Sequence, residues 1–211
     1  MATALTWILV IAAGYLFGNF SSGITSGLAF GKLDIRKYGS KSTGATNVLR
    51  TLGWLPSVLT LLGDALKGLL AALLGKWLLG DLGAYAGGLA AIIGHNWPVF
   101  YGFKGGKGIA TSFGVILIVE PWFGLAVLVC QFVVLWLTKY MSVASAFSAV
   151  LFSILTLVFR FGNWPEIGFA LLLTALALYA HRKNFGRLRR GEENRIHFSG
   201  IRKVQKPDSK P

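Results

Sequence analysis

The chain consists of long apolar runs separated by short segments rich in glycine, proline or charge. The apolar runs cover residues 3–20, 54–79, 82–99, 109–138, 141–159 and 164–180. A helix needs about 20 residues to cross a bilayer core of roughly 30 Å, so each run is long enough, or nearly so, for a crossing. The pattern therefore predicts an all-α integral membrane protein in which residues 1–211 form a single polytopic domain.

The fourth run contains Glu120-Pro121. Proline favours the first turn of a helix, so this run is expected to form two helices that meet at a turn. The first of them, residues 108–119, would extend only about 18 Å at 1.5 Å per residue and would need tilt, a thinner bilayer or a re-entrant path. The prediction is then about seven transmembrane helices.

Positive charge falls on one side of this arrangement. With seven spans, one side of the membrane holds 18 of the 21 Lys and Arg residues, in segments 21–53, 100–108, 139–140 and 181–211. Cytoplasmic segments are enriched in Lys and Arg, which favours an outside N-terminus and a cytoplasmic C-terminus over a six-span alternative. No Lys or Arg precedes Lys32, so the first run is expected to be a retained span rather than a cleaved signal.

Composition agrees with a membrane protein and narrows the function. The chain has a mean hydropathy of +0.61, with 54% hydrophobic and only 14% charged residues, which excludes an ordinary soluble domain. Its net charge of +13 points to an anionic membrane face, nucleic acid or phosphorylated small molecules. The single cysteine, Cys130, allows no intrachain disulfide and no cysteine-based metal site.

The polar segment 21–53 combines basic residues with glycines and hydroxyl groups. Such a sequence lets backbone N–H groups, hydroxyls and cationic side chains converge on an anion. It predicts a phosphate site, and a basic loop that binds anionic lipid head groups is the open alternative. The candidate substrate-binding residues are Lys32, Arg36, Ser40, Ser42, Thr43, Gly44, Thr46, Asn47 and Arg50.

The segment 94–112 repeats this chemistry. Glycines at 102, 105, 106 and 108 surround Lys104 and Lys107, and the candidates are Lys104, Gly105, Gly106 and Lys107. The spacing is not that of a nucleotide P-loop, because a glycine rather than Ser or Thr follows Lys107. His95, just upstream, is a candidate phosphate donor or general base, or an interfacial histidine without such a role.

A third polar segment, 181–196, follows the last span and leads into a short basic tail, 197–211. Many of its basic residues are expected to contact lipid head groups, and the substrate-site candidates are Asn184, Arg187 and Glu192. Glu192 and Glu193 are acids in a strongly basic segment and are able to brace an Arg or Lys, and Glu192 is assigned to this role.

Three residues of the spans add to this picture. Asp64 and Lys67 are three positions apart on one helix face and are expected to form an internal ion pair. Ser142, at the start of the sixth span, faces the same layer as the three polar segments. It is a candidate substrate ligand or a helix cap.

Together the three segments resemble the cytoplasmic motifs of the bacterial acyl-phosphate:glycerol-3-phosphate acyltransferase family, the PlsY type, in the same order. The first motif is matched by GKLDIRKYGSKSTGATNVLR from 31 to 50 and the second by GHNWPVFYGFKGGKGIAT from 94 to 111. The third is matched by Asn184, Arg187-Leu188 and Gly191-Glu192.

The resemblance implies transfer of a fatty acyl group from acyl phosphate to the 1-hydroxyl of glycerol 3-phosphate. The products are lysophosphatidic acid and inorganic phosphate, in the first committed step of phospholipid synthesis. The implied location is the bacterial cytoplasmic (inner) membrane, with the active site at the cytoplasmic face and membrane lipid around the protein. We expect no cofactor, no nucleic acid and no obligate protein partner.

The sequence has no His-x4-Asp pair, the base of another acyltransferase class. An acyl phosphate is already activated, so positioning and electrostatic stabilisation are expected to suffice, with a substrate phosphate oxygen taking the hydroxyl proton. Lys104 is then the principal phosphate clamp. Residues 43–47 and the Gly-Gly turn hold a second phosphate, while His95 and Asn184 orient groups by hydrogen bonds. No metal is expected, because no ligand cluster stands at metal-binding spacing.

Three other functions agree less well with the sequence. A transferase using a CDP-activated lipid would need several aspartates on one helix face, whereas the chain has only Asp34, Asp64, Asp81 and Asp208. A membrane phosphate or anion transporter would predict paired broken helices and an internal repeat, and the sequence indicates neither. Nucleic-acid binding ranks last, because membrane topology already accounts for most of the basic residues.

Overall fold

The computed structural model describes residues 3–196, and the predicted all-α class is confirmed. The α-helices are α1 Ala4–Asn19, α2 Ser22–Gly31, α3 Ala45–Leu52, α4 Trp54–Asn96, α5 Ile109–Val119, α6 Pro121–Thr138, α7 Met141–Phe159 and α8 Trp164–Arg189. Two 3-10 helices, η1 Ile35–Lys37 and η2 Val99–Tyr101, lie in the connections. The basic tail predicted at 197–211 lies outside the described residues.

Much of the exterior is apolar. Within residues 3–196, five helical segments are long and apolar enough to cross a membrane, namely Ala4–Gly31, Trp54–Tyr101, Pro121–Thr138, Met141–Phe159 and Trp164–Arg189. Large side chains project outward from them, and Leu5, Trp77 and Trp122 are each at least 75% exposed. An apolar exterior of this extent suits lipid rather than water.

The α4 segment is two helices joined by a sharp reversal. Gly80 has φ 66° and ψ −153°, a conformation that glycine adopts without the penalty of a Cβ atom. On either side of it the backbones are in close contact, since a Cβ added to Gly75 would lie 2.0 Å from the carbonyl oxygen of Gly83. The long candidate span therefore contains two antiparallel legs, 54–79 and 81–96, close to the two apolar runs seen in the sequence.

The predicted division of the 109–138 run into two helices is confirmed. The first helix, α5, ends at Val119 after only 11 residues, and Pro121 occupies the first turn of α6. Two segments treated as polar loops are more helical than expected. The loop expected at 21–53 contains α2 and α3, and α8 continues to Arg189 through much of 181–196. Polar composition does not oppose helix formation, because a helix can present such residues at its exposed face.

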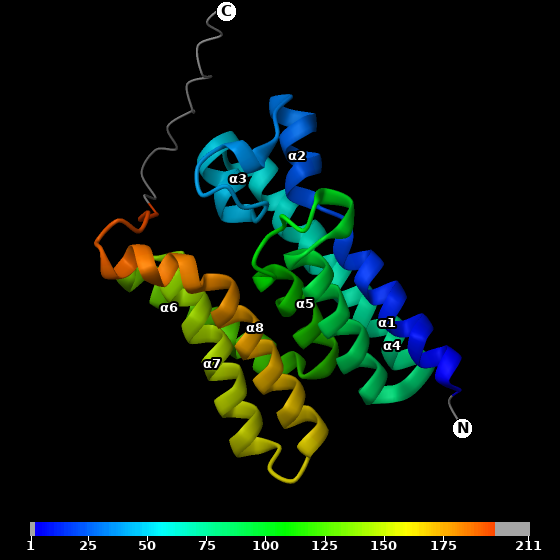
Figure 1. The fold of residues 1–211 in the computed structure, drawn as a ribbon. Coiled ribbons are helices and arrows are strands. Elements are labelled where there is room, and N and C mark those ends of the chain that lie inside the picture. Colours follow the sequence, from blue (N-terminus) through cyan, green and yellow to red (C-terminus); the bar gives the residue numbers. More distant parts are fainter. Residues whose placement is uncertain (1–2, 197–211) are drawn as a thin grey trace, which may run out of the picture.

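Glycines allow the helices to approach closely. Gly14 and Gly18 lie one turn apart on α1, and added Cβ atoms would lie 2.5 Å from the carbonyl oxygen of Gly87 and 2.2 Å from that of Ala91. Small residues at this spacing let helices in membranes pack backbone to backbone. Figure 1 shows α1, α4 and α5 along one side of the molecule and α6, α7 and α8 along the other.

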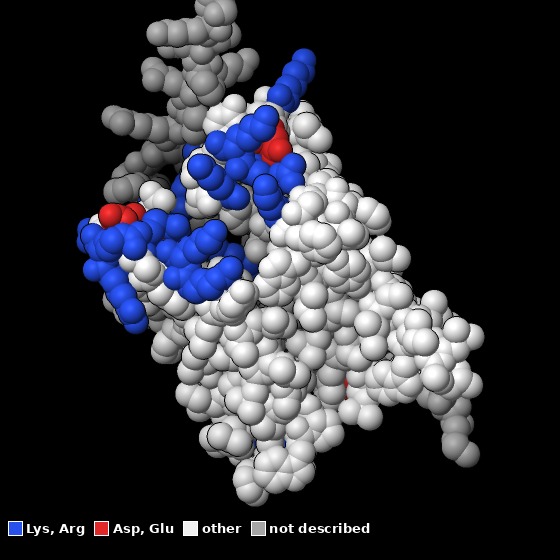
Figure 2. Space-filling model, viewed as in Figure 1, with Lys and Arg blue, Asp and Glu red and all other residues white. Residues whose placement is uncertain are grey.

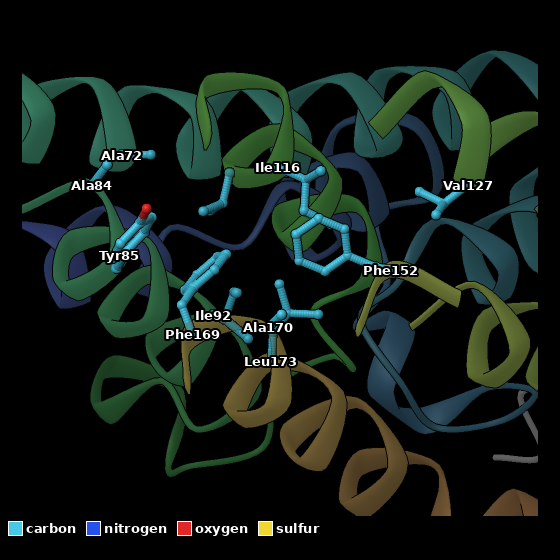
Figure 3. Packing of buried hydrophobic residues seen from close by; sticks show 11 residues of the cluster. Ala72, Ala84, Tyr85, Ile92, Ile116, Val127, Phe152, Phe169, Ala170 and Leu173 are labelled. Carbon is cyan, nitrogen blue, oxygen red and sulfur yellow. The ribbon is translucent and has the colours of Figure 1, made fainter. Parts of the chain in front are cut away.

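Aromatic packing joins these two sides. The rings of Tyr85 on α4 and Phe169 on α8 stack at 5.1 Å between centroids, and Phe152 of α7 meets Phe169 edge-on at 6.2 Å. Figure 3 shows these rings surrounded by aliphatic side chains from α4, α5, α6 and α8. The core thereby fixes the relative positions of the helices whose ends form the polar region.

Charge is concentrated at one end of the molecule. Figure 2 shows Lys and Arg gathered over the loops near α2 and α3 and over the end of α8, above a long surface almost without charge. The start of α1 lies at the opposite end from α2 and α3 (Figure 1). The basic end of the helices is therefore where the predicted polar segments meet.

Candidate active site

A cavity of about 760 Å³, including its open mouth, lies among the predicted polar segments. Its walls come from the loop before α3, both legs of α4, the first turn of α5, α6, the start of α7, the end of α8 and the segment after α8. The predicted site residues that line it are Ser40, Ser42, Gly44, Thr46, Asn47, Arg50, His95, Lys107, Ser142 and Asn184. The fold thus brings parts of all three sequence motifs together.

Three helices begin at this cavity. Gly44 precedes α3, Gly108 precedes α5 and Tyr140 precedes α7, and none of these caps hydrogen-bonds its helix through a side chain. Residues of all three first turns line the cavity. The N–H groups and positive dipole end of a helix N-terminus favour anions. The arrangement is therefore suited to hold phosphate.

Asn47 shapes the loop before α3. Its side-chain oxygen accepts from the Ser40 N–H at 2.8 Å, and its amide donates to the carbonyl oxygens of Ile35, Tyr38 and Ser42 at 2.8–3.1 Å. The asparagine side chain is 1% exposed. Its hydrogen bonds curl the chain so that Ser40 and Ser42 border the cavity, which makes Asn47 chiefly an organiser of the loop.

Two cations border the cavity and are partly buried. Burial lowers the pKa of Lys107 to about 8, with Arg187 and Arg50 lowering it further and Glu193 opposing them. Burial likewise lowers the pKa of Arg50, whose Nη2 donates to the carbonyl oxygen of Asn194 at 3.0 Å. In residues 3–196, no group of three or more His, Cys, Asp or Glu side chains is placed to hold a metal ion. Arg50 and Lys107 are therefore the two cations of the cavity wall that can hold an anion, beside the carboxylates of Asp64 and Glu193.

Glu193 ties the wall of the cavity together. Its carboxylate accepts from Ser142 Oγ at 3.1 Å, Asn184 Nδ2 at 2.6 Å and Arg187 Nε at 2.9 Å. Burial alone would raise the pKa of Glu193, but the Asn184 hydrogen bond and the Arg187 charge outweigh it and keep the pKa below its usual value. The predicted brace, Glu192, does pair with a cation, Arg190 at 2.8 Å, but both side chains are exposed and Glu192 does not line the cavity. Of these two adjacent acids, Glu193 is the one whose carboxylate contacts α7 and α8.

The predicted ion pair between Asp64 and Lys67 is confirmed, and it includes a third residue. Lys67 Nζ lies 2.9 Å from Asp64 Oδ1 and 2.8 Å from His95 Nδ1, and it donates to the Phe20 carbonyl oxygen at 2.6 Å. The three ionisable side chains are at least 95% buried. They connect the α1–α2 junction with both legs of α4, beside the cavity that Asp64 and His95 line.

His181 lines the cavity and was not among the predicted site residues. Its Nδ1 lies 2.8 Å from the carbonyl oxygen of Ala177, and a carbonyl can only accept, so Nδ1 carries a proton. In the neutral ring Nε2 is then an acceptor. The spacing in the sequence could have indicated His181, because it lies three residues before the predicted Asn184 and shares one face of α8 with it. Other lining residues without a predicted role include Leu61, Gln131, Met141 and Ser145.

Several predicted residues lie behind or beside the cavity rather than along its wall. Arg36 is held by Asp34 at 2.8 Å and by the carbonyl oxygen of Tyr101 at 2.9 Å. Thr43 is buried and Lys32 is exposed at the end of α2. The remaining ones are Arg187 and Glu192, both in ion pairs, and Lys104, Gly105 and Gly106.

The glycine-rich loop packs directly on His95. The Gly106 N–H donates to the His95 carbonyl oxygen at 3.0 Å, and an added Cβ at Gly106 would lie 2.0 Å from Nε2 of the same histidine. Gly105 is equally close to the chain, 2.0 Å from that carbonyl oxygen. Lys104 precedes these glycines with an exposed side chain. The two glycines are thus required by packing, whereas the exposed Lys104 does not line the cavity.

Known proteins resemble this chain along most of its length. The model of the glycerol-3-phosphate acyltransferase family matches residues 8–191. A glycerol-3-phosphate acyltransferase from Alkaliphilus metalliredigens is 44% identical over 189 residues, which cover 90% of this chain and 95% of that protein.

The fold is also similar to solved structures of PlsY, an integral membrane glycerol 3-phosphate acyltransferase. Its glycerol 3-phosphate form has a TM-score of 0.85 and 34% identity, covering 90% of this chain and 96% of the other. Its lysophosphatidic acid form has a TM-score of 0.83 and 33% identity, covering 90% and 95%. With the apolar helices described above, these similarities indicate a multi-pass membrane protein. They confirm the resemblance seen in the three motifs, and the chain belongs to the glycerol-3-phosphate acyltransferase family.

Proposed function

We propose that this protein transfers a fatty acyl group from acyl phosphate to the 1-hydroxyl of glycerol 3-phosphate. The hydroxyl oxygen bonds to the acyl carbon, the bond from that carbon to the phosphate oxygen breaks, and inorganic phosphate leaves with the hydroxyl proton. The observation that carries the proposal is the convergence of three helix N-termini with Arg50 and Lys107 on one cavity. Both substrates present a phosphate to such a site, which supports this donor as well as this acceptor.

The phosphate of each substrate binds in its own region of the site. The start of α3, with Ser42, Gly44 and Thr46, holds one phosphate through N–H and hydroxyl groups. Lys104, from the glycine-rich loop, is the principal clamp on the other and stabilises the negative charge that develops as phosphate leaves. Lys104 does not line the cavity, so in this proposal its exposed side chain turns toward the cavity when the donor binds.

The histidines and Asn184 orient the reacting hydroxyl. His95 and Asn184 contribute hydrogen bonds, and Nε2 of His181 accepts one from the hydroxyl, which directs the oxygen toward the acyl carbon. A phosphate oxygen of the substrate then receives the proton. Positioning of this kind lowers the barrier without a dedicated protein base, because the acyl group is already activated.

The same proposal includes the topology. We place the active site at the cytoplasmic face of a bacterial inner membrane, with seven crossings, the N-terminus outside and the C-terminus in the cytoplasm. The basic end of the molecule supports this orientation, because Lys and Arg are retained on the cytoplasmic side. The two legs of α4 and the short α5 supply the crossings beyond the other long apolar helices.

The test is phosphate release by detergent-purified protein. Glycerol 3-phosphate is supplied with palmitoyl phosphate in one reaction and with palmitoyl-CoA in a parallel one, and lysophosphatidic acid is identified by mass spectrometry. Release that requires both substrates, with the CoA ester inactive, is expected. Turnover with the CoA ester would overturn the donor assignment. If the folded protein is inactive with both donors but carries phosphate into liposomes, the proposed enzyme activity is wrong and the protein is a transporter.

A further inference from the structure

The two ring nitrogens of His95 lie in different surroundings. Nδ1 lies 2.8 Å from Lys67 Nζ, within hydrogen-bond distance. On the opposite side of the ring, Nε2 packs against the backbone of Gly106, where an added Cβ would lie 2.0 Å away, and His95 itself lines the cavity. His95 is 5% exposed, so partners within the protein govern the position of its proton.

The surroundings of Lys67 determine which nitrogen carries that proton. Its ammonium group lies 2.9 Å from the Asp64 carboxylate, which favours the charged form, and an ammonium has donors but no acceptor. Nδ1 of His95 must therefore accept. Asp64 Oδ1 is 3.6 Å from the same Nδ1, beyond the range of a normal hydrogen bond, and does not compete for it.

The Lys67 ammonium has three donors and three partners, and one of these partners, His95, belongs to the cavity wall. Burying a lysine and an aspartate among membrane helices is costly unless the pair is satisfied or functional. Lys67 already has Asp64 as its counter-ion and the Phe20 carbonyl oxygen as a hydrogen-bond acceptor. Its remaining direct partner is a histidine of the cavity wall, which points to a role in the site.

We propose that Lys67 and Asp64 are positioning residues that hold His95 with its proton on Nε2, so that this N–H is the hydrogen-bond donor that His95 offers in the active site. Lys67 sets the tautomer, and Asp64 keeps Lys67 charged and in place. This inference rests on the proposed function, in which His95 donates a hydrogen bond to a substrate group. Outer-shell groups that orient a metal-ligating histidine change activity by about 10–100-fold, and we expect an effect of similar size here.

The direct test is nitrogen NMR of the imidazole rings in ¹⁵N-histidine-labelled protein without substrate. The chain has three histidines, so His197→Gln leaves His95 and His181, and His95→Gln assigns the signals. His95 is expected to be protonated on Nε2, while His181, whose Nδ1 donates to a carbonyl, provides an internal reference of the opposite tautomer. A wild-type His95 protonated on Nδ1 would overturn the proposal without any variant being needed.

The variants separate positioning from packing. In Lys67→Met, His95 is expected to lose its single tautomer, and kcat is expected to fall by about 10–100-fold with a smaller change in KM. Lys67→Arg is expected to restore part of the tautomer preference and part of kcat. Lys76→Met is the matched control, because Lys76 lies on the same helix and pairs with Asp81 at 3.2 Å on the surface. Asp64→Asn serves if Lys67→Met does not fold. An unchanged tautomer in a folded variant would refute the role.

The two proposals fail in different ways. If the wild-type protein has the Nε2 tautomer but does not transfer the acyl group, the proposed function is wrong and the tautomer has no role in catalysis. If acyl transfer is normal but His95 carries its proton on Nδ1, only the positioning role given to Lys67 and Asp64 is wrong.

Discussion

The side-chain amide of Asn184 donates to the carboxylate of Glu193 over 2.6 Å, so the chain that follows α8 folds back over the cavity. Ser142 of α7 donates to the same carboxylate at 3.1 Å. One buried acid thereby fixes the ends of two helices and places negative charge near Lys107 and Arg50. The adjacent Glu192 makes no contact of this kind and pairs with Arg190 at the surface.

Replacing Glu193 should therefore damage the site. Glu193→Gln is expected to lower kcat/KM by about 10–100-fold, since hydrogen bonds to a charged group contribute about 1.5–3 kcal/mol. Glu192→Gln is the matched control and should change kcat/KM by less than about threefold, as expected for an exposed pair. Equal effects of the two variants in the phosphate-release assay would contradict the role of Glu193 as the brace.

Activity should decline on the alkaline side because of Lys107. Its pKa is lowered to about 8, so the ammonium is mostly charged at neutral pH and loses its proton as the pH rises through that value. The KM of the phosphate substrates is expected to rise between about pH 7.5 and 9, as an attractive charge is lost from the cavity. Lys107→Arg should keep its charge and flatten this rise. The profile is measured by initial rates in buffers of constant ionic strength.

Lys104 is the residue whose loss should affect the chemistry most. Lys104→Ala is expected to abolish turnover in a protein that remains folded, because the leaving phosphate loses its principal clamp. Lys37→Ala, an exposed lysine of the same basic end, is the control and should retain activity. Size-exclusion chromatography and thermal unfolding in detergent verify the fold, and near-normal turnover of Lys104→Ala would exclude the assignment.

The close approach of α1 and α4 should depend on glycine. Gly18→Ala is expected to destabilise the protein by about 1–3 kcal/mol, because the added Cβ would lie 2.2 Å from the Ala91 carbonyl oxygen. Gly168→Ala, on α8, meets nothing within 4 Å and should leave stability unchanged or raise it by up to about 1 kcal/mol. Thermal unfolding in detergent compares the two. Similar transition temperatures would show that the α1–α4 contact tolerates a side chain.

Local sequence signals determined much of the helical framework. Apolar runs of spanning length predicted most of the long helices, and Pro121 separated α5 from α6 because proline fits only the first turn of a helix. The glycine at 80, between two apolar runs, marked the place where α4 reverses. These features depend on neighbours along the chain, so they are visible without the fold.

The sequence also identified part of the cavity wall, since ten of the predicted site residues line it. The glycines, hydroxyl residues and cations of three short segments predicted phosphate binding and carried the family resemblance. Their spacing within each segment preserves the local turns that a phosphate site requires, as in the loop that Asn47 organises.

Only the tertiary structure decided how these segments act together. The choice of Glu193 over Glu192, the place of His181 in the cavity and the contact of Lys67 with His95 depend on residues brought together from different helices. The convergence of the α3, α5 and α7 N-termini depends in the same way on helix packing, which fixes where each helix begins in space. Sequence periodicity reports which face of a helix is apolar, whereas the partner that meets a given polar side chain is set by close contacts between distant segments.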